Sequence, residues 1–257
     1  SAASDVYKRQ VYDAPTKPWH GVVADTEGDD SVYVMRVERR DGVSQLTLAH
    51  ITPTGTEELA VLEVASAPPH VPDVADFRLL ADGGSSVNHM PAICVIGSGG
   101  DIVLMPVDEE ASAPAEVVGS VDQGILAAAW SPEEDVLVLI TGGEKRLIVM
   151  TREFEVMSET MLSTEAFGDD QPVNVGWGSK STQFHGSEGK QAAMAAANAP
   201  EESDPRGPLV PEDDGLPRIS WRGDGAFFVT SSAEASHDTV HRILRTYTRT
   251  GTLSATS

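Results

Sequence analysis

Three tryptophans recur at nearly equal intervals along the second half of the chain. Trp130, Trp177 and Trp221 are 47 and 44 residues apart. Trp130 and Trp221 each follow a glycine and a short apolar segment, and each precedes a polar turn and a second apolar segment. A unit of this content that recurs every 40 to 50 residues or so is typical of a β-propeller blade, a twisted antiparallel sheet of four strands.

The segment that begins at Gly124 shows one such blade most clearly. Pro132 suits the first turn because proline fixes φ as a type I turn requires. The Gly-Gly pair at 142–143 permits the positive φ of a tight hairpin. A matching order of strand, glycine turn and strand ending in Met precedes it at residues 91–107. We expect the four strands of this blade at residues 124–130, 136–141, 146–151 and 157–163.

Segments nearer the N-terminus also predict strands, at residues 31–39, 45–51 and 57–64, and helical periodicity is nearly absent. Counting the copies predicts an all-β, WD40-like β-propeller that is incomplete, with about five of seven blades. We expect Trp130, Trp177 and Trp221 to end the same strand in successive sheets and to pack between blades, rather than to stack on a ligand. The Trp-Asp dipeptide of typical WD repeats is absent from the sequence.

Two segments fall outside this pattern. Residues 1–10 differ in composition from the rest of the chain, and we interpret them as a non-native leader. Residues 11–257 would then be a partial N-terminal β-propeller. Residues 190–217 begin Ala-rich and continue with prolines and acidic residues, a composition that buries too little apolar surface to offset the entropy of ordering. We expect this insertion to be disordered.

The net charge of −22 limits the classes of molecule that this chain can bind. Such a surface repels nucleic-acid phosphates, and no apolar run approaches the roughly 20 residues that a membrane-spanning helix needs. The last forty residues nevertheless lean basic. They form either an interaction patch or the alternating exposed positions of an edge strand, and the strand-like pattern favours the edge strand. The arginines concerned are Arg218, Arg222, Arg242, Arg245 and Arg249.

The sequence contains only weak matches to motifs for cofactor binding, metal binding or catalysis. Residues 97–102 resemble a dinucleotide-binding turn, but a hairpin strand comes next where a helix is required. His237 and His241 are spaced to bind zinc only on a helix, and their strand-like surroundings indicate two exposed histidines in a hairpin loop. The single cysteine, Cys94, lies in an apolar run and is expected to be buried and inert in a reducing compartment. We expect no catalytic, cofactor-binding or metal-binding residue.

The stretch "VNVGWGSKSTQFHGSEGK", residues 173–190, is similar to the signature segment of the largest subunit of the Elongator complex, the IKAP family. Strings on both sides, including "PRISWRGDGAFFVTSS" at 217–232, resemble the same N-terminal region in order and spacing, from about Ala92 to the C-terminus. The polar side chains of this stretch are our candidate interaction surface, namely Lys180, Gln183, His185 and Lys190.

The resemblance implies a non-catalytic scaffold. In that family the large subunit has two N-terminal WD40-type propellers and then helical repeats, and it self-associates through its far C-terminal region. The complex carries out a 5-carboxymethyluridine-type modification of the wobble uridine of certain tRNAs, with the chemistry in a separate subunit. The expected partners are therefore other Elongator subunits, with tRNA reached indirectly, no cofactor and no membrane. The expected location is the cytoplasm, with the nucleus as a second compartment.

Two other classes of function remain open from the sequence. A generic β-propeller could act as an interaction module in another complex, and it would then purify without Elongator subunits. An enzymatic propeller, such as a lactonase or a glycosidase, would place carboxylates around its central channel, and its metal content would distinguish it.

Overall fold

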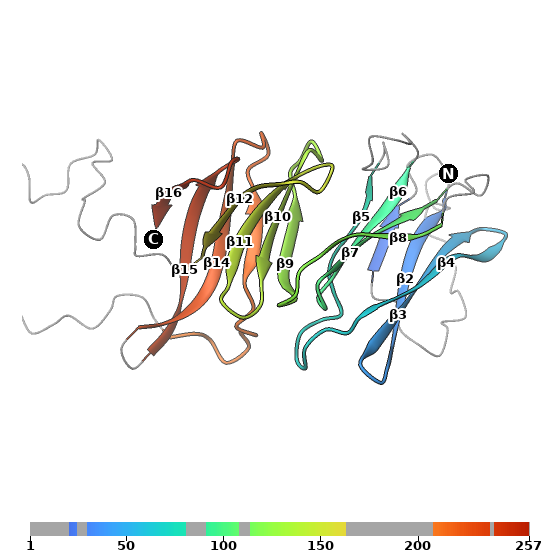
Figure 1. Ribbon diagram of the computed structural model, residues 1–257, viewed down its shortest axis with the longest axis horizontal. Coiled ribbons are helices and arrows are strands. Elements are labelled where there is room, and N and C mark those ends of the chain that lie inside the picture. The colour runs from blue at the N-terminus through green and yellow to red at the C-terminus, as the bar shows by residue number, and fades with distance from the viewer. Residues whose placement is uncertain are drawn as a thin grey trace, which may run out of the picture.

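The computed structural model describes residues 21–24, 30–80, 91–107, 114–162, 208–236 and 239–256 (Figure 1). Their regular elements are sixteen strands in four antiparallel sheets of four strands each. The first sheet contains β1 (Gly21–Ala24), β2 (Val32–Arg40), β3 (Val43–Thr52) and β4 (Gly55–Ala65). The second contains β5 (Val74–Leu80), β6 (Ala92–Gly97), β7 (Asp101–Pro106) and β8 (Glu116–Ser120).

The other two sheets lie in the second half of the chain. The third contains β9 (Ile125–Trp130), β10 (Val136–Thr141), β11 (Arg146–Thr151) and β12 (Val156–Met161). The fourth contains β13 (Arg218–Trp221), β14 (Phe227–Ser236), β15 (Thr239–Thr248) and β16 (Leu253–Thr256). The strands of every sheet lie side by side in chain order. Each sheet is therefore a meander, as predicted for a propeller blade.

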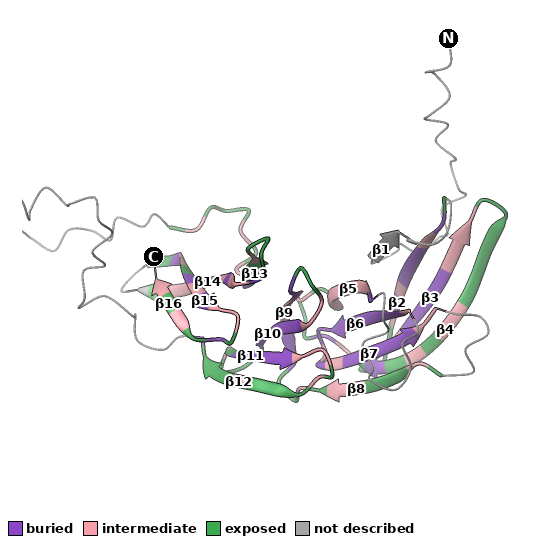
Figure 2. Ribbon diagram, turned by 90° about the horizontal axis from the view of Figure 1, so that it is seen from above, coloured by how far each residue is buried: buried purple, intermediate pink, exposed green. Residues whose placement is uncertain are grey.

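The four sheets succeed one another along an arc (Figure 2). The first strands of consecutive sheets are in contact, since β1 touches β5, β5 touches β9 and β9 touches β13. The last strands β4, β8 and β12 run along the outer rim in Figure 2. This arrangement confirms the predicted all-β class and the incomplete β-propeller.

Three clusters of buried apolar side chains lie between consecutive sheets. The cluster between the first and second sheets contains Tyr33, Met35, Val37, Leu46, Leu48, Val64, Ile93, Val95, Val103 and Met105. The cluster between the second and third contains Leu80, Cys94, Ile96, Ile102, Leu104, Ile125, Trp130, Leu137, Leu139, Ile148 and Met150. The cluster between the third and fourth contains Ala127, Val136, Val138, Ile140, Leu147, Val149, Leu162, Phe228 and Tyr247. Each large side chain contributes about 1.5–3 kcal/mol when fully buried.

The second strands of the two middle sheets explain the long apolar runs in the sequence. In β6, Ile93 and Val95 face the first sheet, whereas Cys94 and Ile96 face the third. Successive side chains of a strand point to opposite faces, so a sheet covered on both faces needs apolar residues at every position. All residues of β6 and β10 are accordingly buried.

Every sheet carries a bulge between its third and fourth strands. The pairing registers skip one residue of the last strand, which is Leu59 in β4, Val118 in β8, Met157 in β12 and Ser254 in β16. A bulge bends the strand and increases its twist. Leu59 and Val118 pack against the adjacent inter-sheet clusters. The bulge is thus a repeated feature of this blade, and it was not predicted.

The predicted strands of the blade that begins at Gly124 are confirmed as β9 to β12, with bounds that differ by one or two residues. The described residues form four sheets, and about five were predicted for the whole chain. The blade expected around Trp177 lies outside those residues. The third and fourth sheets are direct neighbours, because β9 contacts β13. Trp130 and Trp221 therefore stand in adjacent sheets, with no sheet between them.

The predicted disorder of residues 190–217 needs a correction at the C-terminal end of that range. Residues 190–207 lie outside the described part of the chain. Residues 208–217, which we call the strap, are placed against the fourth sheet. The Leu209 amide donates to the Val240 carbonyl oxygen at 3.0 Å, and Arg242 forms an ion pair with Asp213 at 2.5 Å. These contacts offset the cost of ordering that composition alone suggested.

Candidate interaction surface

The third and fourth sheets are equivalent position by position. Trp130 ends β9 and Trp221 ends β13. In the turn after each tryptophan, the amide of Ser131 donates to the Val136 carbonyl at 2.8 Å, and the amide of Arg222 donates to the Phe227 carbonyl at 2.9 Å. Phe227 thus stands where Val136 stands in the third sheet. Because the two sheets are equivalent, the face of the third sheet that the fourth sheet covers indicates what the corresponding face of the fourth sheet is suited to pack against.

The centre of the face of the third sheet that the fourth sheet covers is apolar. It presents Val136, Val138, Ile140, Leu147 and Val149 to Phe228, Tyr247 and Trp221. The pairing registers place Phe227, Val229, Ser231, Leu244 and Thr246 at the corresponding positions of the fourth sheet. Leu244 is 46% exposed there, whereas its counterpart Leu147 is 1% exposed. The far face of the fourth sheet is therefore a sheet-packing surface that lacks a covering sheet in the described chain.

A groove of about 520 Å³ opens on this far face. Its lining residues are Ser220, Trp221, Arg222, Phe227, Val229 and Thr246. The guanidinium carbon of Arg222 lies 4.7 Å from the centroid of the Phe227 ring, and Arg222 also forms an ion pair with Asp224 at 2.5 Å. The groove is thus mainly apolar, with a neutralised pair at its rim.

The strap borders the same face at the other end of the sheet. Asp213 receives two hydrogen bonds from Arg242, at 2.6 and 2.5 Å. These bonds, with a further one from the Gly215 amide, lower the pKa of Asp213 to about 2. Arg242 also donates to the carbonyl of Leu216 at 3.1 Å, so one guanidinium holds both ends of the strap turn.

The five arginines of the basic C-terminal region do not form a free cationic patch. Each pairs with a carboxylate: Arg218 with Asp214, Arg222 with Asp224, Arg242 with Asp213, Arg245 with Glu234, and Arg249 with Asp135. The predicted edge strand is also wrong for Arg242 and Arg245, because β15 is an inner strand between β14 and β16, whereas Arg249 lies in the turn after β15. The positive charges of these five arginines are therefore neutralised by carboxylates of the same chain.

A buried ion pair joins two side chains at the interface between the third and fourth sheets. Arg245 is 3% exposed and lies beside Glu234, whose carboxylate also accepts a hydrogen bond from the Ser232 hydroxyl at 2.6 Å. Burial opposes ionisation of Glu234, but the hydrogen bonds from Arg245 and Ser232 outweigh it, so the pKa of Glu234 is lowered. Lys145 of the third sheet donates to the Ala233 carbonyl at 3.3 Å and adds a polar link between the two sheets.

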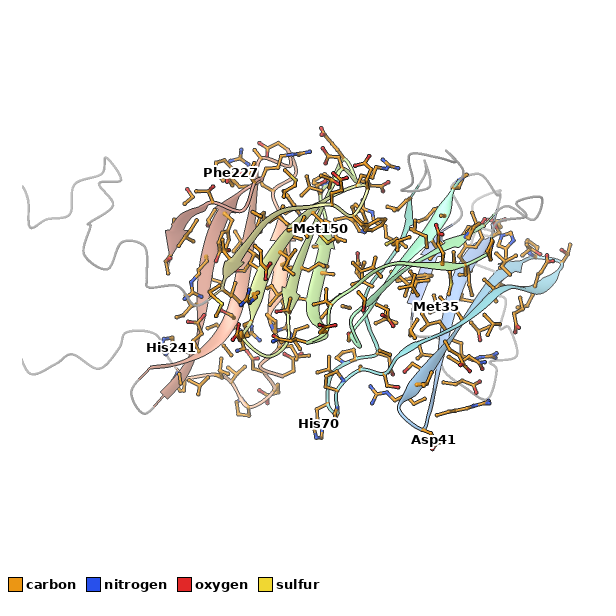
Figure 3. The ribbon with its side chains drawn as sticks, viewed as in Figure 1. Met35, Asp41, His70, Met150, Phe227 and His241 are labelled. Atoms are coloured by element: carbon orange, nitrogen blue, oxygen red, sulfur yellow. The ribbon has the colours of Figure 1, made fainter. Side chains whose placement is uncertain are left out.

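The histidine and cysteine expectations have different outcomes. His241 is buried in β15, at 1% exposure, and is not in an exposed loop, because its side chain faces the third sheet beside Glu234. Phe227 and His241 lie at opposite ends of the fourth sheet (Figure 3). His237 lies outside the described residues. Cys94 is buried as predicted, and burial and the Asp76 carboxylate raise its pKa.

The predicted surface residues Lys180, Gln183, His185 and Lys190 all lie outside the described residues, as does Trp177. Within the described ranges, no group of three or more His, Cys, Asp or Glu side chains is arranged to hold a metal ion. No helix in the same ranges is long and apolar enough to cross a membrane.

The residues of the far face were not predicted to form a surface. The signal was nonetheless present in the sequence, because the repeat that aligned Trp130 with Trp221 also aligns Val136 with Phe227 and Val138 with Val229. Phe227 and Val229 thus occupy positions that require a covering sheet.

Comparison with known proteins identifies a family model and relatives that match this sequence. A family model described as "ELP1 first N-terminal beta-propeller" matches residues 5–257. Elongator complex protein 1 of Oryctolagus cuniculus is 39% identical over 166 residues, which is 65% of this chain and 12% of that protein. The protein of the same name from Schizosaccharomyces pombe is 38% identical over 168 residues, 65% of this chain and 13% of that protein. The chain thus spans 12–13% of the length of these relatives.

Proposed function

Because the chain belongs to the family of the first N-terminal β-propeller of Elongator complex protein 1, we propose that it is part of a non-catalytic scaffold in an Elongator complex. In this role it supports the modification of tRNA wobble uridines by holding other subunits in place. The match of the family model over residues 5–257 is the observation that carries the proposal. The identity of 38–39% to Elongator complex protein 1 from a mammal and from a yeast supports it.

The distribution of charge also favours protein partners over direct contact with tRNA. The chain has 40 acidic residues against 18 basic ones. Ten of the described arginines lie in ion pairs with carboxylates, which leaves few cations to release the counterions of an RNA backbone. They are Arg36, Arg39, Arg40, Arg78, Arg146, Arg218, Arg222, Arg242, Arg245 and Arg249. In the proposal, tRNA is therefore reached indirectly, through other subunits.

The location is part of the same proposal. One cysteine cannot form an internal disulfide, which suits a reducing compartment such as the cytoplasm.

The proposal is tested by deleting the propeller from the complete protein in its own cells. A tagged full-length protein and the deletion variant are purified, and the co-purifying proteins and the modified wobble uridine of bulk tRNA are measured by mass spectrometry. We expect the deletion to reduce both the recovery of Elongator subunits and the modified uridine.

A second arm separates a scaffold from an enzyme. Substituting exposed carboxylates of the described residues in groups of three should leave the modified uridine at the level of the unsubstituted protein, provided that the subunits still co-purify. Loss of the modification with an intact complex would contradict a non-catalytic role. Recovery of a different set of proteins, with unchanged tRNA, would contradict membership of the complex.

A further inference from the structure

The outermost strand of the third sheet differs from the outermost strands of the other three. β4 contributes Val64 to an inter-sheet cluster, and Val118 of β8 and Leu253 of β16 pack against such clusters. No residue of β12 belongs to, or packs against, any of the three clusters. β12 instead exposes three large apolar side chains, Val156 at 58%, Met157 at 46% and Met161 at 36%.

The backbone edge of β12 is open as well. β12 pairs with β11 on one side and is the last strand of its sheet, so no described strand pairs with its other side. Figure 2 shows β12 exposed along its length on the outer rim. Edge strands usually discourage pairing through charges or bulges. The bulge of β12 lies at Met157, near its beginning, and Ser158 to Met161 continue in regular register with β11.

The charge within the strand is neutralised, but the charge around it is not. Glu159, the one charged residue of β12, forms an ion pair with Arg146 at 2.7 Å. Glu153 and Glu155 are exposed just before the strand, and neither takes part in an ion pair within the described chain. An approaching segment therefore meets apolar side chains beside unpaired carboxylates. A second copy of this chain, at a net charge of −22, is a poor match for such an edge.

We propose that the free edge of β12 is a strand-addition site for an extended segment of a partner protein that alternates apolar and cationic residues. The segment pairs its backbone with β12, as peptides do when they extend a sheet. Its apolar side chains cover Val156 and Met157, and its lysines or arginines approach Glu153 and Glu155. Methionine suits this role because its flexible side chain adapts to different partners.

The test uses the purified 257-residue chain and a fluorescent eight-residue peptide of alternating valine and lysine. Binding is followed by fluorescence anisotropy, and backbone pairing by amide hydrogen exchange of the fragment that contains β12. We expect saturable binding with slower exchange in that fragment. V156K and M157K should each weaken binding about tenfold or more, because they remove apolar contact and add a like charge.

The matched control is V61K on β4, where Val61 is also 46% exposed on an outermost strand. It should leave the affinity unchanged. E153Q combined with E155Q should weaken binding, and a peptide of alternating valine and glutamate should not bind. Absence of binding, equal weakening by V61K and M157K, equal binding of the glutamate peptide, or binding without slower exchange in β12 would each overturn the proposal.

Discussion

The indole nitrogen of Trp221 donates a hydrogen bond to the carbonyl oxygen of Ala129, 3.2 Å away in the neighbouring sheet. The donor ends the first strand of the fourth sheet, and the acceptor precedes Trp130 at the end of the first strand of the third sheet. One repeated tryptophan is thus tied to the residue before the other. The two tryptophans that recur in the sequence therefore lie at the contact between the third and fourth sheets.

Trp130→Ala is expected to lower the free energy of unfolding by about 3–5 kcal/mol, because the side chain is 4% exposed and packs edge-on against Phe154 at a centroid distance of 6.0 Å. Trp221→Phe should cost only about 1 kcal/mol, since it keeps an aromatic ring and loses one hydrogen bond. Urea unfolding followed by circular dichroism measures both. Equal losses for the two variants would contradict this ranking.

Glu234→Gln should be among the most destabilising changes in the fourth sheet, at about 3–5 kcal/mol, because it leaves the buried Arg245 without its counter-charge. The comparison is Asp224→Asn, which breaks the solvent-exposed pair with Arg222 and should leave the unfolding midpoint unchanged. Thermal unfolding of the two variants side by side decides the matter. A midpoint for Glu234→Gln equal to that of the parent would show that the pair is dispensable.

Acid should release the strap before it unfolds the sheets. The pKa of Asp213 is about 2, below its ordinary value of 3.8, because Arg242 donates to its carboxylate. A lowered pKa contributes stability above about pH 4, and that contribution is lost as the pH falls from about 4 to about 2. The protection of residues 208–217 against hydrogen exchange, taken relative to the intrinsic exchange rate at each pH, should fall over this range in the parent. In Asp213→Asn the exchange should already be fast at neutral pH.

Gly99→Ala is expected to cost about 1–3 kcal/mol, because a Cβ at this position would lie 1.9 Å from the carbonyl oxygen of Ala65 at the end of β4. The turn of the second sheet approaches the first sheet too closely for any side chain. Gly55→Ala serves as the control, since a Cβ there meets nothing within 4 Å. Chemical unfolding of the two single variants should separate them clearly.

Leu244→Lys should improve the behaviour of the isolated chain without destabilising it. Leu244 is 46% exposed on the far face of the fourth sheet, so its substitution removes little buried contact. An uncovered apolar sheet face favours association between molecules. Light scattering at increasing concentration should show less association for the variant than for the parent. Leu147→Lys, at the equivalent covered position, should prevent folding instead.

The strands could be predicted from the sequence wherever one physical rule dominated. The runs at 92–97 and 136–141 are buried at every position and almost wholly apolar because neighbouring sheets cover both faces, and their glycine turns mark where they end. The neighbour relations could not be predicted. Spacing alone placed Trp177 between Trp130 and Trp221, but the contact between β9 and β13 depends on tertiary packing that a repeat length does not encode.

The strap and His241 were missed for a different reason. Composition reports how much apolar surface a segment can bury, and residues 208–217 have little. Their order comes from one guanidinium, that of Arg242, which lies 29 positions from Asp213 in the sequence. His241 stands in a strand whose inward positions also hold Arg245, and a buried polar position looks in the sequence like an exposed one.

Among the described residues, the contacts that join the first strands of the sheets link consecutive sheets. Such an array behaves like a row of coupled units, in which stability is a sum of individual terms and nearest-neighbour terms. Damage to the cluster between the second and third sheets would therefore divide the molecule into two halves, each still holding one intact junction. Damage at either end would only fray a single unit. A partner seated on the rim of the third sheet would accordingly be anchored to a unit with neighbours on both sides, which holds its position best.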